Sequence, residues 1–279
     1  MTDTPAHATF PVNSGLSSYQ QPQRVTQLRV MRAEWTKLRT QPSAYWALLT
    51  AVILVVGFGI GYSLLRVARP PHGTAIASFD PAAISLSGVQ LAQIAVGVLG
   101  VMVVTSEYAT GMIRTTFAAV PRRLPMLWGK AVLLAAAITA VSLPAAFAAF
   151  AGGQSILSRR HLSVPLSHPG VARAVIGCAL YLAAVALLGL GLGALIRNAA
   201  GGIAVLLGLL YGFPLAVGLL PGSIATDVTK FLPTGAGQAV TTVQPDPTML
   251  QPWTGFGVLC AYAAVVLAMS AARMWRGDA

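Results

Sequence analysis

The chain has 279 residues, of which 56% are hydrophobic and only 9% are charged. An average soluble domain carries about 25% charged residues, so a purely soluble fold is excluded. The net charge of +11 could indicate a nucleic-acid partner, but the basic residues lie at the margins of long apolar blocks. This placement is typical of proteins that meet anionic headgroups, so we expect membrane lipid and not nucleic acid as a partner.

The first 24 residues are rich in Pro, Ser, Thr and Gln and lack the basic start and apolar stretch of a signal peptide. Residues 1–24 are therefore predicted to form a disordered cytosolic tail. In residues 25–42, apolar side chains recur at helical spacing, which predicts an amphipathic interfacial helix on the membrane surface. A polybasic anchor would explain this helix equally well, whereas Glu34 favours a further contact with a cytosolic partner.

Six long stretches contain no charged residue. Because an ionised side chain at the bilayer centre costs about 3 kcal/mol or more, such stretches are the candidate membrane spans. Each stretch exceeds the roughly 20 residues needed to cross hydrocarbon. We therefore predict an all-α, polytopic domain over residues 43–276, with transmembrane helices at about 44–65, 84–105, 130–152, 172–196, 200–221 and 253–273.

The distribution of Lys and Arg predicts the orientation of these spans. Of the 18 basic residues, 12 lie in the N-terminal tail, the loop between spans two and three, the loop after span four, and the C-terminus. The other side holds six. The positive-inside rule therefore places the N- and C-termini in the cytoplasm of a multi-pass protein of the cell membrane.

Glycines recur four residues apart in two spans, Gly57 with Gly61 and Gly189 with Gly193. Such spacing lets helix backbones approach closely in a membrane, so both pairs are predicted to be packing faces. The segment from Gly189 to Ala194 also matches a loose dinucleotide-binding pattern. It follows no strand and lies inside an apolar span, so we reject nucleotide binding there.

The loop between spans two and three contains an acidic residue, Glu107, at the predicted cytosolic edge. Ser106 and Glu107 are predicted to open a short helix by capping and by complementing its dipole, and Pro121 to end it. A short helix joined to two spans acts as a lever, because a force on it moves both. In the opposite loop, residues 231–240 are apolar but broken by Pro and Gly, which predicts a re-entrant or surface-lying segment.

Few polar residues fall inside the spans. They indicate a candidate substrate pathway, although hydrogen bonding between helices or helix kinking is the commoner reason for such residues in a span. The spans need no deep acid or base, which disfavours an ion-coupled carrier and favours a hydrophobic or amphiphilic cargo. The candidate pathway residues are Gln90, Gln93, Tyr211 and Phe213.

Three motifs carry a resemblance to a known family. They are Glu-Trp-Thr-Lys-Leu-Arg-Thr from residue 34, Ser-Glu-Tyr-x-x-Gly-Met-Ile-Arg-Thr-Thr from residue 106, and Leu-Pro-Thr-Gly-Ala-Gly-Gln-Ala from residue 232. Together with the six-span plan, they resemble the ABC-2 type transporter permeases of actinobacteria over residues 25–276. The resemblance implies a type V exporter-like fold with a cytosolic coupling helix. It also implies a dimer of permeases, as a homodimer or with a similar chain, and two copies of an ABC ATPase subunit.

The resemblance also implies which residues meet the ATPase subunit, and it implies that spans two and five line the pathway between permease subunits. The chain lacks G-x-x-x-x-G-K-[ST], so ATP and Mg are expected on the partner, and no cofactor or enzymatic activity in this chain. The implied ATPase contact comprises Glu107, Tyr108, Gly111, Arg114 and Thr115, with Glu34 and Trp35 of the interfacial helix beside it.

Two other classes of function compete with export. A non-transporting membrane scaffold or sensor component would share the same spans. An intramembrane enzyme would need convergent acids, histidines or nucleophiles, and the spans contain no such set. The two cysteines lie in apolar runs and the loop histidines are scattered, so no catalytic or metal site is predicted.

Overall fold

The computed structural model describes residues 42–69, 79–109, 123–244 and 248–276, and this part of the chain is helical throughout its regular structure. The predicted tail 1–24, the interfacial helix with Glu34 and Trp35, and most of the predicted coupling segment lie outside the described residues. Gly111, Arg114 and Thr115 belong to that segment.

Within the described residues, six helices are long and apolar enough to cross a membrane, as the sequence predicted, and the chain is a multi-pass membrane protein. The first span joins α2 (Pro42–Ile53), η1 (Leu54–Phe58) and α3 (Gly59–Ala68), and the fifth joins α9 (Ala199–Leu207), η4 (Gly208–Gly212) and α10 (Phe213–Val217). The other four spans consist mainly of α5 (Val89–Ala109), α7 (Arg123–Leu157, followed by η3, Ser158–Arg160), α8 (Val171–Ile196) and α13 (Pro252–Arg276).

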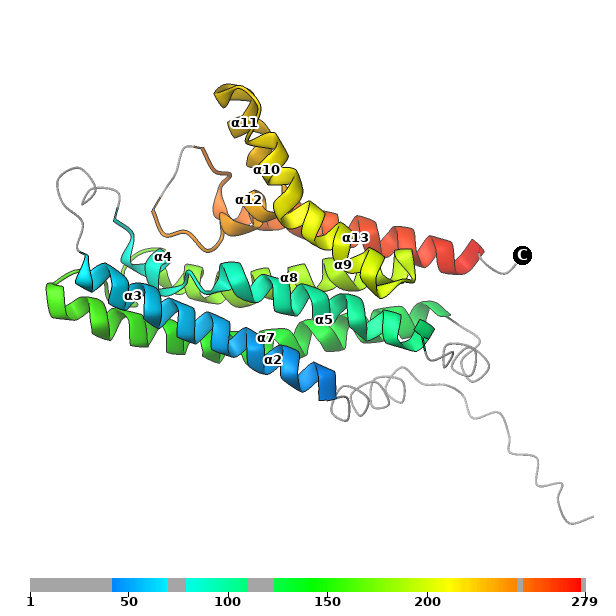
Figure 1. Cartoon of the computed structure of the whole chain (residues 1–279), viewed down its shortest axis with the longest axis horizontal. Helices are drawn as coiled ribbons and strands as arrows, with labels where there is room; N and C mark the ends of the chain where they lie inside the picture. Colours follow the sequence, from blue (N-terminus) through cyan, green and yellow to red (C-terminus); the bar gives the residue numbers. More distant parts are fainter. Residues whose placement is uncertain (1–41, 70–78, 110–122, 245–247, 277–279) are drawn as a thin grey trace, which may run out of the picture.

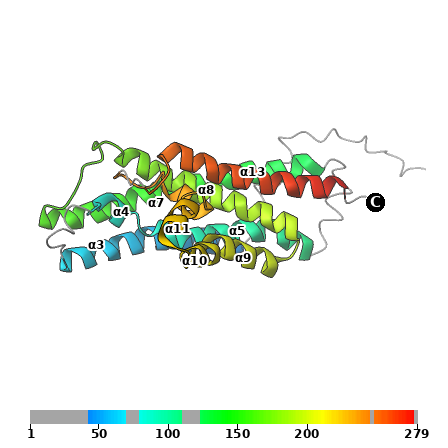
Figure 2. The same cartoon turned by 90° about the horizontal axis from the view of Figure 1, so that it is seen from above.

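Helix α8 is the centre of the bundle and packs against α5, α7 and α13 (Figures 1 and 2). Its glycines make this possible. A Cβ atom on Gly189 would lie 2.2 Å from the Gly97 carbonyl oxygen, and one on Gly193 would lie 2.7 Å from that of Val101. The predicted packing face on α8 is therefore confirmed.

The predicted packing face at Gly57 and Gly61 is wrong within the described chain, because Cβ atoms there would meet nothing within 4 Å. Both glycines lie on the outer surface of the first span. Spacing of four residues fixes only that two glycines share a helix face. Which face turns inward depends on the neighbours of that helix.

Span two is broken, contrary to the continuous helix predicted from residue 84. The short helix α4 (Pro81–Ser85) begins where the Asp80 carboxylate accepts hydrogen bonds from the Ala82 and Ala83 amides. A turn over residues 86–88 then leads into α5. At this turn, a Cβ on Gly88 would lie 2.3 Å and 2.5 Å from the Leu54 and Val55 carbonyl oxygens, so span two crosses span one in close backbone contact.

The chain between spans five and six leaves the bundle and returns to it. Helices α10 and α11 (Gly222–Thr229) project sideways from the bundle, and α12 (Pro233–Gln238) comes back against it (Figure 1). Helix α12 packs on α13, and Gly237 lies against the buried ring of Tyr181 on α8. This packing is compatible with both predicted arrangements of residues 231–240, re-entrant and surface-lying.

Replacement of Gly189 by Val is expected to destabilise the protein by about 1–3 kcal/mol, because its side chain must displace the backbone of α5. The matched variant Gly61→Val adds the same side chain where nothing lies within 4 Å. Thermal unfolding of the detergent-solubilised variants measures the difference. Equal melting temperatures for the two variants would contradict the packing of α8 on α5.

Candidate functional site

A cluster of five neutral polar side chains joins spans two, four and five to helix α12; we call it the polar cluster. At its centre is Gln93 on α5, which is fully buried. The hydroxyl of Tyr181 on α8 donates a hydrogen bond to Gln93 Oε1. Gln93 Nε2 donates to the Tyr211 hydroxyl oxygen at 2.8 Å and to the Gln90 carbonyl oxygen at 3.0 Å. The fifth member is Gln238.

The π-helical turn η4 and helix α12 complete the polar cluster. Tyr211 lies in η4, and its hydroxyl donates to the Gln90 carbonyl oxygen at 2.7 Å. Gln238, at the end of α12, donates from Nε2 to Gln90 Oε1 at 2.7 Å. The Thr234 hydroxyl donates to the Leu210 carbonyl oxygen at 2.8 Å, so α12 is tied to η4 as well. π-Turns inside helices occur frequently at functional sites.

The polar cluster is closed on one side and open on the other. Gln93 and Tyr181 are 0% exposed, whereas Tyr211 is 38% exposed and Gln90 is also exposed. A polar group turned toward hydrocarbon without a partner costs several kcal/mol. We therefore expect the open side, at Gln90 and Tyr211, to meet water, a cargo molecule or another protein chain.

Three of the four predicted pathway residues come together in this cluster: Gln90, Gln93 and Tyr211. Phe213 lies two residues beyond Tyr211 with 53% of its surface exposed, and it takes no part in the hydrogen bonds. Sequence reasoning missed Tyr181, because a single tyrosine in an apolar span resembles any buried aromatic residue. Gln238 was also missed, although it belongs to the motif that begins at residue 232.

A second polar contact lies at the other end of α5. Lys130 Nζ on α7 is 2.7 Å from Glu107 Oε1, and the two residues are 4% and 5% exposed. This buried ion pair joins the end of α5 to the start of α7, and residues 110–122 connect these two helices in the chain. The ends of that connection are therefore held together by a charge pair shielded from solvent.

The predicted short helix opening at Ser106 and Glu107 is wrong, because α5 continues through both residues to Ala109. Capping would have required the chain to leave the helix before Ser106. Instead the Glu107 carboxylate finds its partner in Lys130, 23 residues further on, and the apolar helix simply extends. Its side chain faces the interior of the chain and not an outer surface.

Basic residues gather around this end of the bundle. The guanidinium of Arg197, which follows α8 in a left-handed conformation with φ of 61°, lies 5.6 Å from the centre of the Tyr108 ring. Arg273 on α13 donates a hydrogen bond to the Leu195 carbonyl oxygen. Arg and Lys near a helix C-terminus also complement the negative end of the helix dipole. The Arg197 contact involves Tyr108, the one predicted ATPase-contact residue that is described and partly exposed.

No group of three or more His, Cys, Asp or Glu side chains in the described ranges could hold a metal ion. Cys178 is buried and Cys260 partly buried, and neither forms a disulfide. No protein-family model matches the chain, and no curated protein matches it. The structure thus defines a polytopic helical membrane protein with a neutral polar cluster inside its bundle and a buried ion pair at one end.

The variant Tyr181→Phe is expected to lower the free energy of unfolding by about 1 kcal/mol, because it leaves the buried Gln93 Oε1 without its donor. Tyr45→Phe is the control, since Tyr45 is 53% exposed on the first span. Chemical or thermal unfolding in detergent measures both. A Tyr181→Phe variant as stable as Tyr45→Phe would show that the polar cluster does not hold α5 to α8.

Proposed function

We propose that the chain is the membrane-spanning permease subunit of an ATP-driven ABC-type exporter. In this proposal it has the ABC-2, type V exporter fold and moves a hydrophobic or amphiphilic substrate outward. A separate ATPase subunit, present in two copies, hydrolyses ATP with Mg. A second permease subunit, identical or similar, completes the assembly in the cell membrane, with the chain termini in the cytoplasm.

The observation that carries the proposal is the buried Glu107–Lys130 ion pair. It holds α5 and α7 together at the connection formed by residues 110–122. A force applied to that connection by a partner therefore acts on both helices together. Removing one partner of a buried ion pair by mutation costs about 3–5 kcal/mol, because the remaining charge is left buried without a counter-ion.

Helix α5 links this junction to the polar cluster. It is continuous over 21 residues, about 30 Å at 1.5 Å per residue. Gln90 and Gln93 are at its start and Glu107 is in its last turn. A rigid-body movement of α5, driven from the Glu107 end, therefore shifts the hydrogen-bonding partners of Tyr211 and Gln238. This is the kind of coupling that a transport cycle requires.

The chemistry of the polar cluster agrees with the proposed cargo. Its side chains are three amides and two phenols, and the described cluster contains no charged group. Amides and phenols recognise uncharged hydrogen-bonding groups, and the same span also presents exposed apolar residues such as Phe213. An amphiphilic molecule can use both surfaces.

In this proposal Glu107 is a positioning residue, and the ATPase contact is provided by Tyr108, Gly111, Arg114, Thr115, Glu34 and Trp35. The charge reversal Glu107→Lys is expected to reduce co-purification of the ATPase subunit and to uncouple ATP hydrolysis from export. The physical reason is that the introduced ammonium would lie beside that of Lys130 in a site closed to solvent, and two buried cations in contact repel each other. Pull-down from native membranes and transport into inverted vesicles are the measurements.

The double variant Glu107→Lys with Lys130→Glu restores the pair with reversed polarity and is expected to recover association and coupling. Arg159→Glu, an exposed charge reversal at the opposite end of the bundle, is the matched control. Normal coupling in Glu107→Lys, at normal expression, would refute the proposal. A folded double variant that fails to bind the ATPase would instead assign Glu107 a direct contact.

Orientation is tested separately with single cysteines in a background in which Cys178 and Cys260 are replaced by Ala. The cysteine of Arg159→Cys is expected to react with a membrane-impermeant maleimide added to intact cells. That of Trp275→Cys, at a position 78% exposed near the end of α13, should react only after the membrane is opened. The reverse pattern would place the termini outside and contradict an inward-facing coupling segment.

A further inference from the structure

A pocket of about 320 Å³ lies in the connection between spans five and six and shares only Gln238 with the polar cluster described above. Helix α11 and the segment after it form one wall, and α12 and residues 248–249 form the rest. Its lining combines hydroxyl, amide, ammonium and apolar groups: Ala225, Thr226, Thr229, Lys230, Gly235, Gln238, Thr248 and Met249.

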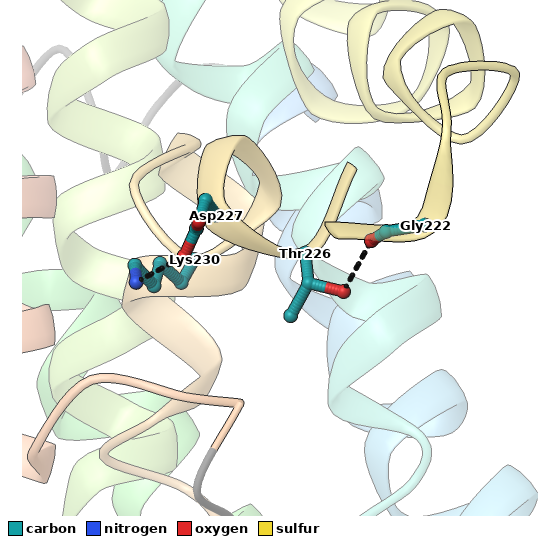
Figure 3. A network of polar contacts seen from close by, with 4 residues as sticks. All are labelled: Gly222, Thr226, Asp227 and Lys230. Carbon is teal, nitrogen blue, oxygen red and sulfur yellow. Dashed lines mark hydrogen bonds and ion pairs between the residues drawn. The ribbon is translucent and has the colours of Figure 1, made fainter. Parts of the chain in front are cut away.

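The pocket carries one cation, and an anion lies next to it. Lys230 Nζ is 2.7 Å from Asp227 Oδ1, one turn earlier, as Figure 3 shows. The Lys230 side chain is 29% exposed and lines the pocket, whereas that of Asp227 is 72% exposed. Exposed pairs at this spacing contribute under about 1 kcal/mol, so a ligand can replace the contact at little cost.

Hydroxyl groups extend the polar lining beside the ammonium. The Thr226 hydroxyl donates to the Gly222 carbonyl oxygen at 2.8 Å, so its own oxygen remains an acceptor (Figure 3). Thr229 also lines the pocket, next to Lys230. The Lys230 ammonium and the Thr229 hydroxyl are donors of the kind that phosphate oxygens require, whereas the Thr226 oxygen can accept a hydrogen bond from a ligand's own cation.

Charge balance selects among phosphate-bearing ligands. A purely anionic headgroup would compete with Asp227 for Lys230 and would leave two anions close together. A zwitterion satisfies both side chains, because its phosphate takes the Lys230 ammonium and its own ammonium takes the Asp227 carboxylate. The greater exposure of Asp227 places the ligand's cation on the outer side and its phosphate inside.

Apolar side chains next to the pocket can hold the rest of such a ligand. Leu220, Ile224 and Phe231 are 45%, 52% and 49% exposed; Ile224 lies within α11, and the other two lie just before and just after it in the chain. Met249 and Ala225 add apolar surface within the pocket itself. Large exposed apolar side chains beside a polar pocket fit an amphiphile with an acyl chain.

We propose that this pocket binds the headgroup of a phospholipid in which a phosphate and a primary ammonium form a zwitterion, as in phosphatidylethanolamine. Lys230 and Thr229 hold the phosphate, and Asp227 holds the ammonium, for which the Thr226 hydroxyl oxygen is a further acceptor. The acyl chains follow the apolar side of α11. This assignment stands on the pocket alone and does not depend on ATP-driven export.

The test is native mass spectrometry of the full chain in nanodiscs made from equal amounts of phosphatidylethanolamine and phosphatidylglycerol. The variants are Lys230→Gln, which removes the cation at similar length, and Asp227→Asn. Arg159→Gln is the control, because Arg159 is an exposed basic residue away from the pocket. Size-exclusion profiles and melting temperatures establish that each variant is folded.

The native chain is expected to retain phosphatidylethanolamine in preference to phosphatidylglycerol, and Lys230→Gln to lose about tenfold in that retention. Asp227→Asn should reverse the preference, since it leaves Lys230 without a competing anion. Equal retention by the native chain, Lys230→Gln and Arg159→Gln would overturn the proposal. If the native chain retained neither lipid but bound soluble phosphoethanolamine, the zwitterion would be a free molecule and the assignment to a lipid would be overturned.

Discussion

The structure depends on one constraint: hydrocarbon offers no hydrogen bonds, so every polar group within a span must find its partner inside the protein. Most of the chain meets this constraint with uninterrupted apolar helices. Span two does not, because it breaks at residues 86–88 and carries two glutamines directly after the break. The surrounding elements supply hydrogen-bonding partners for these amides: Gln93 accepts a hydrogen bond from Tyr181 on α8 and donates one to Tyr211 in η4.

The same constraint explains where the helices are irregular. Span one is π-helical over Leu54–Phe58, where the Gly88 backbone packs against it. Span five is π-helical over Gly208–Gly212. There the Thr234 hydroxyl donates to a backbone carbonyl of the turn, and the Tyr211 hydroxyl donates to the Gln90 carbonyl oxygen. The irregular turns of three spans thus adjoin one another around the start of α5. Irregular backbone in a membrane protein is tolerated where it is buried in protein or lines a polar space, and this region provides both.

The sequence was sufficient to predict the six spans and the all-α class, because each span must be free of charged residues whatever helices surround it. It also drew attention to Gln90, Gln93 and Tyr211, since an amide or phenol is conspicuous among alanine and leucine. It did not predict the break before α5, because glycine weakens a helix by only about 1 kcal/mol and is common within membrane spans, so Gly88 alone does not indicate a break. Nor did it pair Glu107 with Lys130, because the pairing depends on how two helices meet in space.

Helix α12 gives the site a particular order of assembly. It packs against α13, which is synthesised after it, as well as against the earlier helices α8 and η4. Its full set of contacts is therefore complete only once α13 has emerged from the ribosome and entered the bilayer. Gln238 can occupy its native place beside Gln90 only at that stage, so truncation before residue 252 would leave a nascent chain with five inserted segments and an unfinished centre.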